Sequence, residues 1–170
     1  MIFMRDIQEA VRAKLEKLLA ANPERMDFYT RYQAIITRYN KEQDRATIEK
    51  AFEELMKLVK ELDDEEKRYV REGFDSDDEL AVYDMLFKDG LSKSDIKKIK
   101  DVAVELLKKV GDKIAEFDHC WDKEETRAEV GNLIRNILYA ELPEDYSDSA
   151  IFECHQRIYE YIYTRYGEAA

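Results

Sequence analysis

The chain is poor in residues that turn a backbone sharply, with only five glycines and two prolines among its 170 residues. Strand-rich folds connect their strands by turns that favour these residues, so the scarcity argues against such folds. Long hydrophobic runs are also missing, because charged residues interrupt every apolar stretch before it reaches the roughly eighteen residues that a membrane span requires. We therefore expect neither a strand-rich fold nor a membrane protein.

Sequence motifs for catalysis are equally scarce. No Gly-rich loop ends in Gly-Lys-Ser or Gly-Lys-Thr, which excludes nucleotide binding of the P-loop kind. The only cysteines are Cys120 and Cys154, and no secretory signal begins the chain, a combination that favours the reducing cytoplasm. We predict no catalytic residue and no cofactor-binding residue in this chain.

Histidine and cysteine occur as two adjacent pairs, His119-Cys120 and Cys154-His155. Neighbouring residues on a helix point about 100° apart, whereas zinc ligands are usually spaced two to five residues apart, so adjacent pairs converge poorly on one ion. Glu116 and His119 have the Glu-x-x-His spacing of di-iron bundles, but the chain has no second such pair. We predict no metal site, a solvated helix end at His119 and a hydrogen-bonded core histidine at His155.

The formal net charge of −11 is spread unevenly along the chain. Residues 1–60 carry a net +2, residues 61–79 a net −7, residues 80–115 a net +2 and residues 116–170 a net −8. An acidic domain repels phosphate backbones unless a local basic stripe outweighs the rest. Seven lysines from position 93 to 113 could form such a stripe, but six acidic residues in the segment 80–115 dilute it. We expect at most an auxiliary contact with DNA.

Apolar residues recur with the three- and four-residue spacing of amphipathic helices along nearly the whole chain. Helices are expected at about residues 6–20, 23–39, 47–72, 77–89, 93–114, 123–141 and 147–167, and the acidic run at about 63–66 could interrupt the third. The predicted fold is therefore all-α: an irregular multi-helix bundle of about six to eight helices, forming a single domain over residues 1–170.

Several helix ends carry recognisable caps. Asn22 can cap a helix that begins at Pro23, where a missing N–H costs nothing. Ser76 and Ser92 are each followed three residues later by an acidic residue, the spacing of a capping box. These local signals support the helix starts independently of the apolar spacing.

Three residues of the last third of the chain stand out. Trp121, the only tryptophan, is expected to be buried where one helix gives way to the next. Arg127 falls at the edge of an apolar stripe, so part of its guanidinium should be desolvated and paired with a carboxylate or a helix C-terminus. Tyr161 lies with Cys154 on the flank of the last helix, and an exposed tyrosine there could anchor an interface.

Two blocks of sequence, in this order, resemble the helical C-terminal domain of the R subunit, the motor and nuclease subunit, of type I restriction enzymes. The first block is Asn22-Pro23-Glu24-Arg25-Met26-Asp27-Phe28-Tyr29-Thr30-Arg31-Tyr32, continuing to Ile35-Ile36 and Tyr39-Asn40. The second is Trp121-Asp122-Lys123-Glu124-Glu125-Thr126-Arg127-Ala128-Glu129-Val130, followed by Ile134-Arg135, Leu138, Leu142-Pro143 and Tyr146. The likeness covers residues 22–166, and the intervening helices match only in pattern.

The resemblance implies that the chain is the C-terminal fragment of a much longer R subunit. That subunit would be a type I site-specific deoxyribonuclease with ATP-dependent DNA translocase activity, and ATP and Mg²⁺ would bind outside this domain. The implied role is non-catalytic assembly: docking the motor onto the methyltransferase core, chiefly its M subunit, beside the helicase lobes of its own chain. The alternative is a free-standing helical adaptor unrelated to restriction, and a third, enzymatic hypothesis rests only on the His/Cys pairs.

The acidic segments are predicted to help orient the domain on its protein partner, because complementary charge accelerates encounter and selects register. Asp77, Asp78, Glu144 and Asp145 are the candidate contacts, since they are expected in solvated turns where substitution would do little damage to the fold. The alternative is that these charges only keep the domain soluble.

Overall fold

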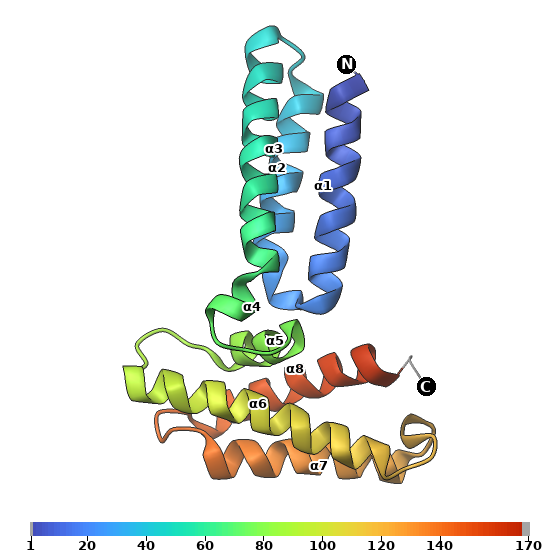
Figure 1. Ribbon diagram of the computed structural model, residues 1–170, viewed down its shortest axis with the longest axis vertical. Helices are drawn as coiled ribbons and strands as arrows, with labels where there is room; N and C mark the ends of the chain where they lie inside the picture. The colour runs from blue at the N-terminus through green and yellow to red at the C-terminus, as the bar shows by residue number, and fades with distance from the viewer. Residues whose placement is uncertain (1, 168–170) are drawn as a thin grey trace. The chain divides into compact units, whose positions relative to one another are not determined.

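The computed structural model describes residues 2–167, and all of the regular structure in that range is helical (Figure 1). The α-helices are α1 (Ile2–Ala21), α2 (Met26–Lys41), α3 (Arg45–Glu66), α4 (Arg68–Arg71), α5 (Asp77–Leu86), α6 (Lys93–Ala115), α7 (Glu124–Glu141) and α8 (Asp148–Gly167). Two short 3-10 helices, η1 (Pro23–Arg25) and η2 (Cys120–Asp122), precede α2 and α7. The prediction of an all-α, multi-helix fold is confirmed.

The chain divides into two compact units, Met1–Asp77 and Asp78–Ala170. Each unit has its own buried apolar side chains and is described by itself below. The prediction of a single domain over residues 1–170 stays a prediction. Within the described residues, no helix combines the length and the apolar character that crossing a membrane would require.

The first unit is built on three long helices, α1, α2 and α3, which run alongside one another (Figure 1). Their facing sides supply its core through residues three and four positions apart, as amphipathic helices do. The buried members are Met4, Val11, Leu15 and Leu18 of α1, Ile35 of α2, and Ala51, Leu55, Leu58 and Leu62 of α3.

The turn between α1 and α2 is held by Asn22, which is fully buried. Its side-chain oxygen accepts a hydrogen bond from the Glu24 N–H at 3.1 Å, and Pro23 occupies the first position of η1. The predicted cap is therefore confirmed, although the first turn after it is a 3-10 helix and α2 proper begins at Met26. The break between α3 and α4 falls at Lys67, directly after the acidic run.

A buried ion-pair cluster, which the sequence did not predict, closes this end of the first unit. Arg25 is only 3% exposed and donates to both carboxylate oxygens of Asp77, at 2.8 and 2.6 Å. Its Nη1 also donates to the Leu18 carbonyl, and its Nε lies 3.6 Å from a carboxylate oxygen of Glu65. Glu65 is itself buried and accepts from Arg68. The cluster supplies counter-charges for a cation that packing has removed from water, although the Arg25 Nε–H has no hydrogen-bond partner among the described residues.

The second unit contains α6, α7 and α8, with α7 packed against both of the others, and the short helix α5 (Figure 1). Burial covers several sides of α5, because Leu80, Ala81, Val82, Tyr83, Met85 and Leu86 are all buried. The predicted cap of α6 is confirmed, since the Ser92 hydroxyl accepts from the Asp95 N–H. The start of α8 is capped in the same way, by the Ser147 hydroxyl and the Ala150 N–H.

Candidate functional site: a groove between α7 and α8

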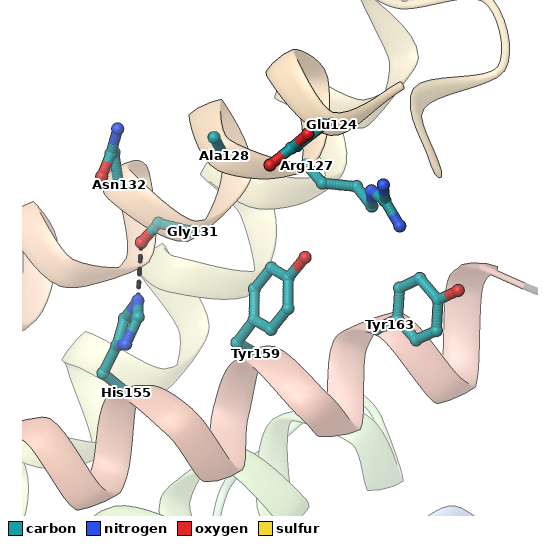
Figure 2. A pocket seen from close by; sticks show the side chains of 8 residues that line it. All are labelled: Glu124, Arg127, Ala128, Gly131, Asn132, His155, Tyr159 and Tyr163. Atoms are coloured by element: carbon teal, nitrogen blue, oxygen red, sulfur yellow. Dashed lines mark hydrogen bonds between the residues drawn. The ribbon is translucent and has the colours of Figure 1, made fainter. Parts of the chain in front are cut away.

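A groove of about 570 Å³ lies between α7 and α8 of the second unit (Figure 2). Its α8 wall consists of side chains at intervals of four residues, which share one face of a helix. The lining residues are Glu124, Arg127, Ala128, Gly131 and Asn132 of α7 and His155, Tyr159 and Tyr163 of α8. Of these, only Arg127 was a candidate site residue from sequence, although the His155, Tyr159, Tyr163 series was readable as one face of the last helix.

His155 closes one end of the groove by a hydrogen bond across the helix pair. Its Nε2 lies 2.8 Å from the carbonyl oxygen of Gly131 (Figure 2). Because a carbonyl oxygen can only accept, Nε2 carries the proton in this arrangement. The imidazole also stacks on the Tyr159 ring, with an interplanar angle of 24°. The prediction of a hydrogen-bonded histidine is confirmed, and the ring is half-buried rather than fully in the core.

Gly131 of α7 lies beside the Tyr159 ring of α8. A Cβ built on it would lie 3.6 Å from Cε2 of Tyr159, which is ordinary van der Waals contact. The glycine therefore leaves space beside the tyrosine ring rather than relieving a clash. That space is part of the groove.

Arg127 lines the groove and has no ionic partner among residues 2–167. Its Nε is buried and has no hydrogen-bond partner, and no carboxylate among residues 2–167 forms an ion pair with it. The expected pairing with a carboxylate is therefore not found among residues 2–167: its α7 neighbour Glu124 also lines the groove but does not bind it. Burial raises the pKa of the neighbouring Tyr159 phenol, and the positive charge of Arg127 offsets part of that shift.

Trp121 supports the tyrosine wall of the groove from behind. It is 7% exposed and packs edge-on against Tyr163, with ring centroids 5.3 Å apart, and against Tyr159 at 6.4 Å. The predicted burial at the junction of two helices is confirmed, since η2 lies between α6 and α7. The indole Nε1 is buried and has no hydrogen-bond partner among the described residues.

Tyr161 does not present an exposed anchor, and that expectation is wrong. The residue is 5% exposed, and its hydroxyl donates to Asp78 Oδ1 at 2.9 Å. Tyr166 and Arg165 donate to the same carboxylate at 2.8 and 2.9 Å. Burial and the Asp78 charge raise the pKa of both phenols. The sequence pattern suggested that this flank of α8 is exposed, but Asp78 of α5 lies against it.

The four candidate acidic contacts fall into two groups. Asp77 pairs with the buried Arg25 in the first unit, and Asp78 accepts three hydrogen bonds in the second. Both side chains are half-buried, so the expectation that they lie in solvated turns is wrong. Glu144 and Asp145 are exposed between α7 and α8, as expected. Whether any of the four contacts a partner stays a prediction.

The two cysteines are free and buried. Burial raises the pKa of both thiols, which lowers the thiolate fraction at neutral pH. His119 lies on the exposed turn before η2, where it is 3.6 Å from Asp122, and it does not meet His155. Within residues 2–167, no three His, Cys, Asp or Glu side chains are grouped as metal ligands would be.

The lysines of α6 are partly neutralised by their neighbours. Lys109 pairs with Glu105 at 2.6 Å, and Lys113 lies 3.3 Å from Glu129 of α7. Lys100 lies over the Tyr83 ring. The row of lysines on α6 is therefore less basic than its composition suggests.

Comparison with known protein families gives one clear result. The family model described as type I restriction enzyme HindI endonuclease subunit-like, C-terminal, matches residues 4–162. No curated protein and no solved structure matches the chain. The matched range contains both sequence blocks that suggested the resemblance, begins in α1 and extends into α8. The chain therefore belongs to the family of C-terminal domains of type I restriction enzyme HindI endonuclease subunit-like proteins.

Proposed function

We propose that this chain docks the endonuclease subunit of a type I restriction enzyme onto the methyltransferase core, through the M subunit. The observation that carries the proposal is the family match over residues 4–162, which assigns the chain to the C-terminal part of that subunit. A motor that reels in DNA must stay anchored to the subunits that recognise the target. A helical domain at the end of the motor chain is suited to form that anchor.

We further propose that the chain contributes no chemistry of its own, so that ATP and Mg²⁺ serve the nuclease and motor parts of a longer polypeptide. The state of the nucleophilic side chains supports this. Burial raises the pKa of Cys120 and Cys154, and His155 is held by the Gly131 carbonyl. A thiol in apolar surroundings is a poor nucleophile, and neither thiol lines the groove.

The surface of the second unit supports docking to a protein. Large apolar side chains stay in contact with solvent there, and such residues supply most of the affinity in protein interfaces. They are Phe87, Val104, Tyr139, Phe152 and Tyr163. The exposed acids Glu144 and Asp145 lie between the two helices that carry three of these residues. Exposed apolar anchors together with exposed acids suit a partner surface that offers apolar side chains and basic groups.

Two further contacts are part of the proposal. The helicase lobes of the same polypeptide would lie beside this domain, because both belong to one subunit. Lysines of α6 would make at most an auxiliary contact with DNA, since Lys109 and Lys113 already have acidic partners. The chain as a whole is acidic, which disfavours independent binding to a phosphate backbone.

The proposal is tested by isothermal titration of the purified chain into the methyltransferase core of the same restriction system. We expect saturable binding with a Kd of about 10 µM or tighter, equivalent to roughly −7 kcal/mol or better. A DNA methyltransferase from outside the type I class is the control and should give no saturable heat. Absence of binding to the core at concentrations where the chain stays monomeric would overturn the proposal.

A further inference from the structure

We propose that the groove between α7 and α8 receives an aspartate or glutamate side chain of the protein partner, which Arg127 binds through its guanidinium between Tyr159 and Tyr163. The inference rests on the proposed docking function and names the chemistry that the partner must present. It assigns a role to a half-buried cation that has no counter-charge among residues 2–167.

Arg127 differs in its ionic partners from the other arginines that packing partly or fully removes from water. Among residues 2–167, three arginines are buried or half-buried: Arg25, Arg68 and Arg127. Arg25 binds Asp77, and Arg68 binds Glu65. Arg127 alone of the three has no carboxylate partner among these residues, and its buried Nε, like that of Arg25, has no hydrogen-bond acceptor there. Removing part of a guanidinium from water without a counter-charge is costly, and an arriving carboxylate would reduce that cost without breaking an ion pair among residues 2–167.

The groups around Arg127 are those that recognise a carboxylate. Figure 2 shows its side chain extending from α7 on the side of the groove where Tyr159 and Tyr163 stand. A guanidinium can hold a carboxylate through two parallel hydrogen bonds, and phenol hydroxyls can donate to the same oxygens. The Asn132 side chain at the other end of the groove offers an amide that can both donate and accept.

A single carboxylate fits this groove better than a nucleic-acid phosphate backbone does. Glu124 lines the groove together with Arg127, and the segment 116–170 around it carries a net −8. One cation can neutralise one carboxylate, whereas a chain of phosphates would meet the surrounding acids and be repelled. The local charge therefore disfavours a chain of phosphates more strongly than a single carboxylate, which Arg127 can neutralise.

The shape of the groove points to a segment of a protein as the bearer of that side chain. The α8 wall follows His155, Tyr159 and Tyr163, and eight residues of helix correspond to a length of about 12 Å. The volume of about 570 Å³ is enough for several side chains. Tyrosine and arginine are also the residue types that dominate binding energy in protein interfaces.

The first test is titration of the chain with the methyltransferase core, using Arg127→Met as the variant and Arg45→Met as its matched control. Arg45 lies in the first unit, is exposed and does not line the groove. We expect Arg127→Met to weaken binding roughly 30-fold and Arg45→Met to change it less than about threefold. Equal effects of the two substitutions, or wild-type binding by Arg127→Met, would overturn the inference while leaving the docking function standing. Circular dichroism and Trp121 fluorescence check that both variants are folded.

The second test does not depend on the core. In NMR titrations of the chain, the Arg127 Nε–H signal is followed with two capped peptides, acetyl-Ala-Ala-Glu-Ala-Ala-amide and the same peptide with Gln in place of Glu, and with inorganic phosphate. We expect the Glu peptide alone to shift the signal in a saturable way. Equal shifts with the Gln peptide, stronger shifts with phosphate, or no shift at about 10 mM peptide would each overturn the carboxylate assignment. A chain that binds the Glu peptide but not the core would contradict only the proposed function.

Discussion

At the scale of single residues, Arg25 shows how a buried charge is satisfied by partners far away in the sequence. Arg25 is 3% exposed. Asp77 binds its guanidinium through two hydrogen bonds, and a Glu65 carboxylate oxygen lies 3.6 Å from its Nε. No local pattern in the sequence predicts this cluster, because Asp77 lies 52 positions from Arg25. Asp77 was for that reason expected in a solvated turn.

Asp77→Asn is expected to lower the free energy of unfolding by about 2 to 4 kcal/mol, because it removes a counter-charge and leaves Arg25 with Glu65 alone. Asp75→Asn is the matched control, since Asp75 is exposed two positions earlier and should change stability by less than about 0.5 kcal/mol. Urea denaturation followed by circular dichroism measures both. Similar midpoints for the two variants would mean that the cluster contributes little.

At the scale of helices, starts were predictable where the signal is local. The Asn22 and Ser92 side chains accept from backbone N–H groups two and three positions later, so the chemistry of each cap is contained in a few consecutive residues. The short helix η2 was harder to predict, because it follows His119, whose backbone is in the left-handed conformation with φ of 55°. Only a break in the region was predicted, since nothing in the sequence marks a histidine for that conformation.

The candidate groove and its surroundings were predictable only in part, because contacts between residues distant in the sequence leave no local signal. Trp121 was expected to be buried because a large aromatic side chain between two apolar-periodic segments has few other places to go. The partner of Tyr161 could not be found, because Asp78 comes from a helix 83 positions away in the sequence. The state of Arg127 could not be predicted either, because its lack of a counter-charge among residues 2–167 becomes visible only when the side chains of that range are placed.

Trp121→Ala is expected to destabilise the second unit by about 3 to 5 kcal/mol, since it removes the ring that packs on Tyr159 and Tyr163 at the junction of α6, η2 and α7. Trp121→Phe is the control: it keeps a ring in place and omits the indole N–H, which has no partner among residues 2–167, and it should cost less than half as much. Urea unfolding gives both values. A wild-type tryptophan emission like that of indole in water would contradict the burial itself.

At the scale of the whole molecule, the acidic charge should affect the rate of assembly more than its strength. Apolar anchors supply most of the affinity of an interface, whereas charges at the rim steer the encounter. Asp77 and Asp78 are half-buried and already paired, so Glu144 and Asp145, which are exposed, are the remaining candidates for steering the encounter. These two acids can be neutralised without breaking an ion pair found in the described structure.

The double variant Glu144→Gln, Asp145→Asn is expected to slow association with the methyltransferase core by about two- to fivefold at low salt, and to leave dissociation nearly unchanged. The difference should shrink as salt screens the charges. Stopped-flow or surface-based kinetics at two salt concentrations gives both rates. Association at the wild-type rate, with the same salt dependence, would assign these acids to solubility alone.

The burial of the two cysteines has a practical consequence for following this molecule in solution. Cys120 and Cys154 are 3% and 8% exposed, and burial raises the pKa of both thiols. Maleimide reagents attack thiolates, so the folded chain should give little background labelling. A fluorophore can therefore be attached through a cysteine introduced on the surface, while slow reaction of the native thiols records how often the second unit opens.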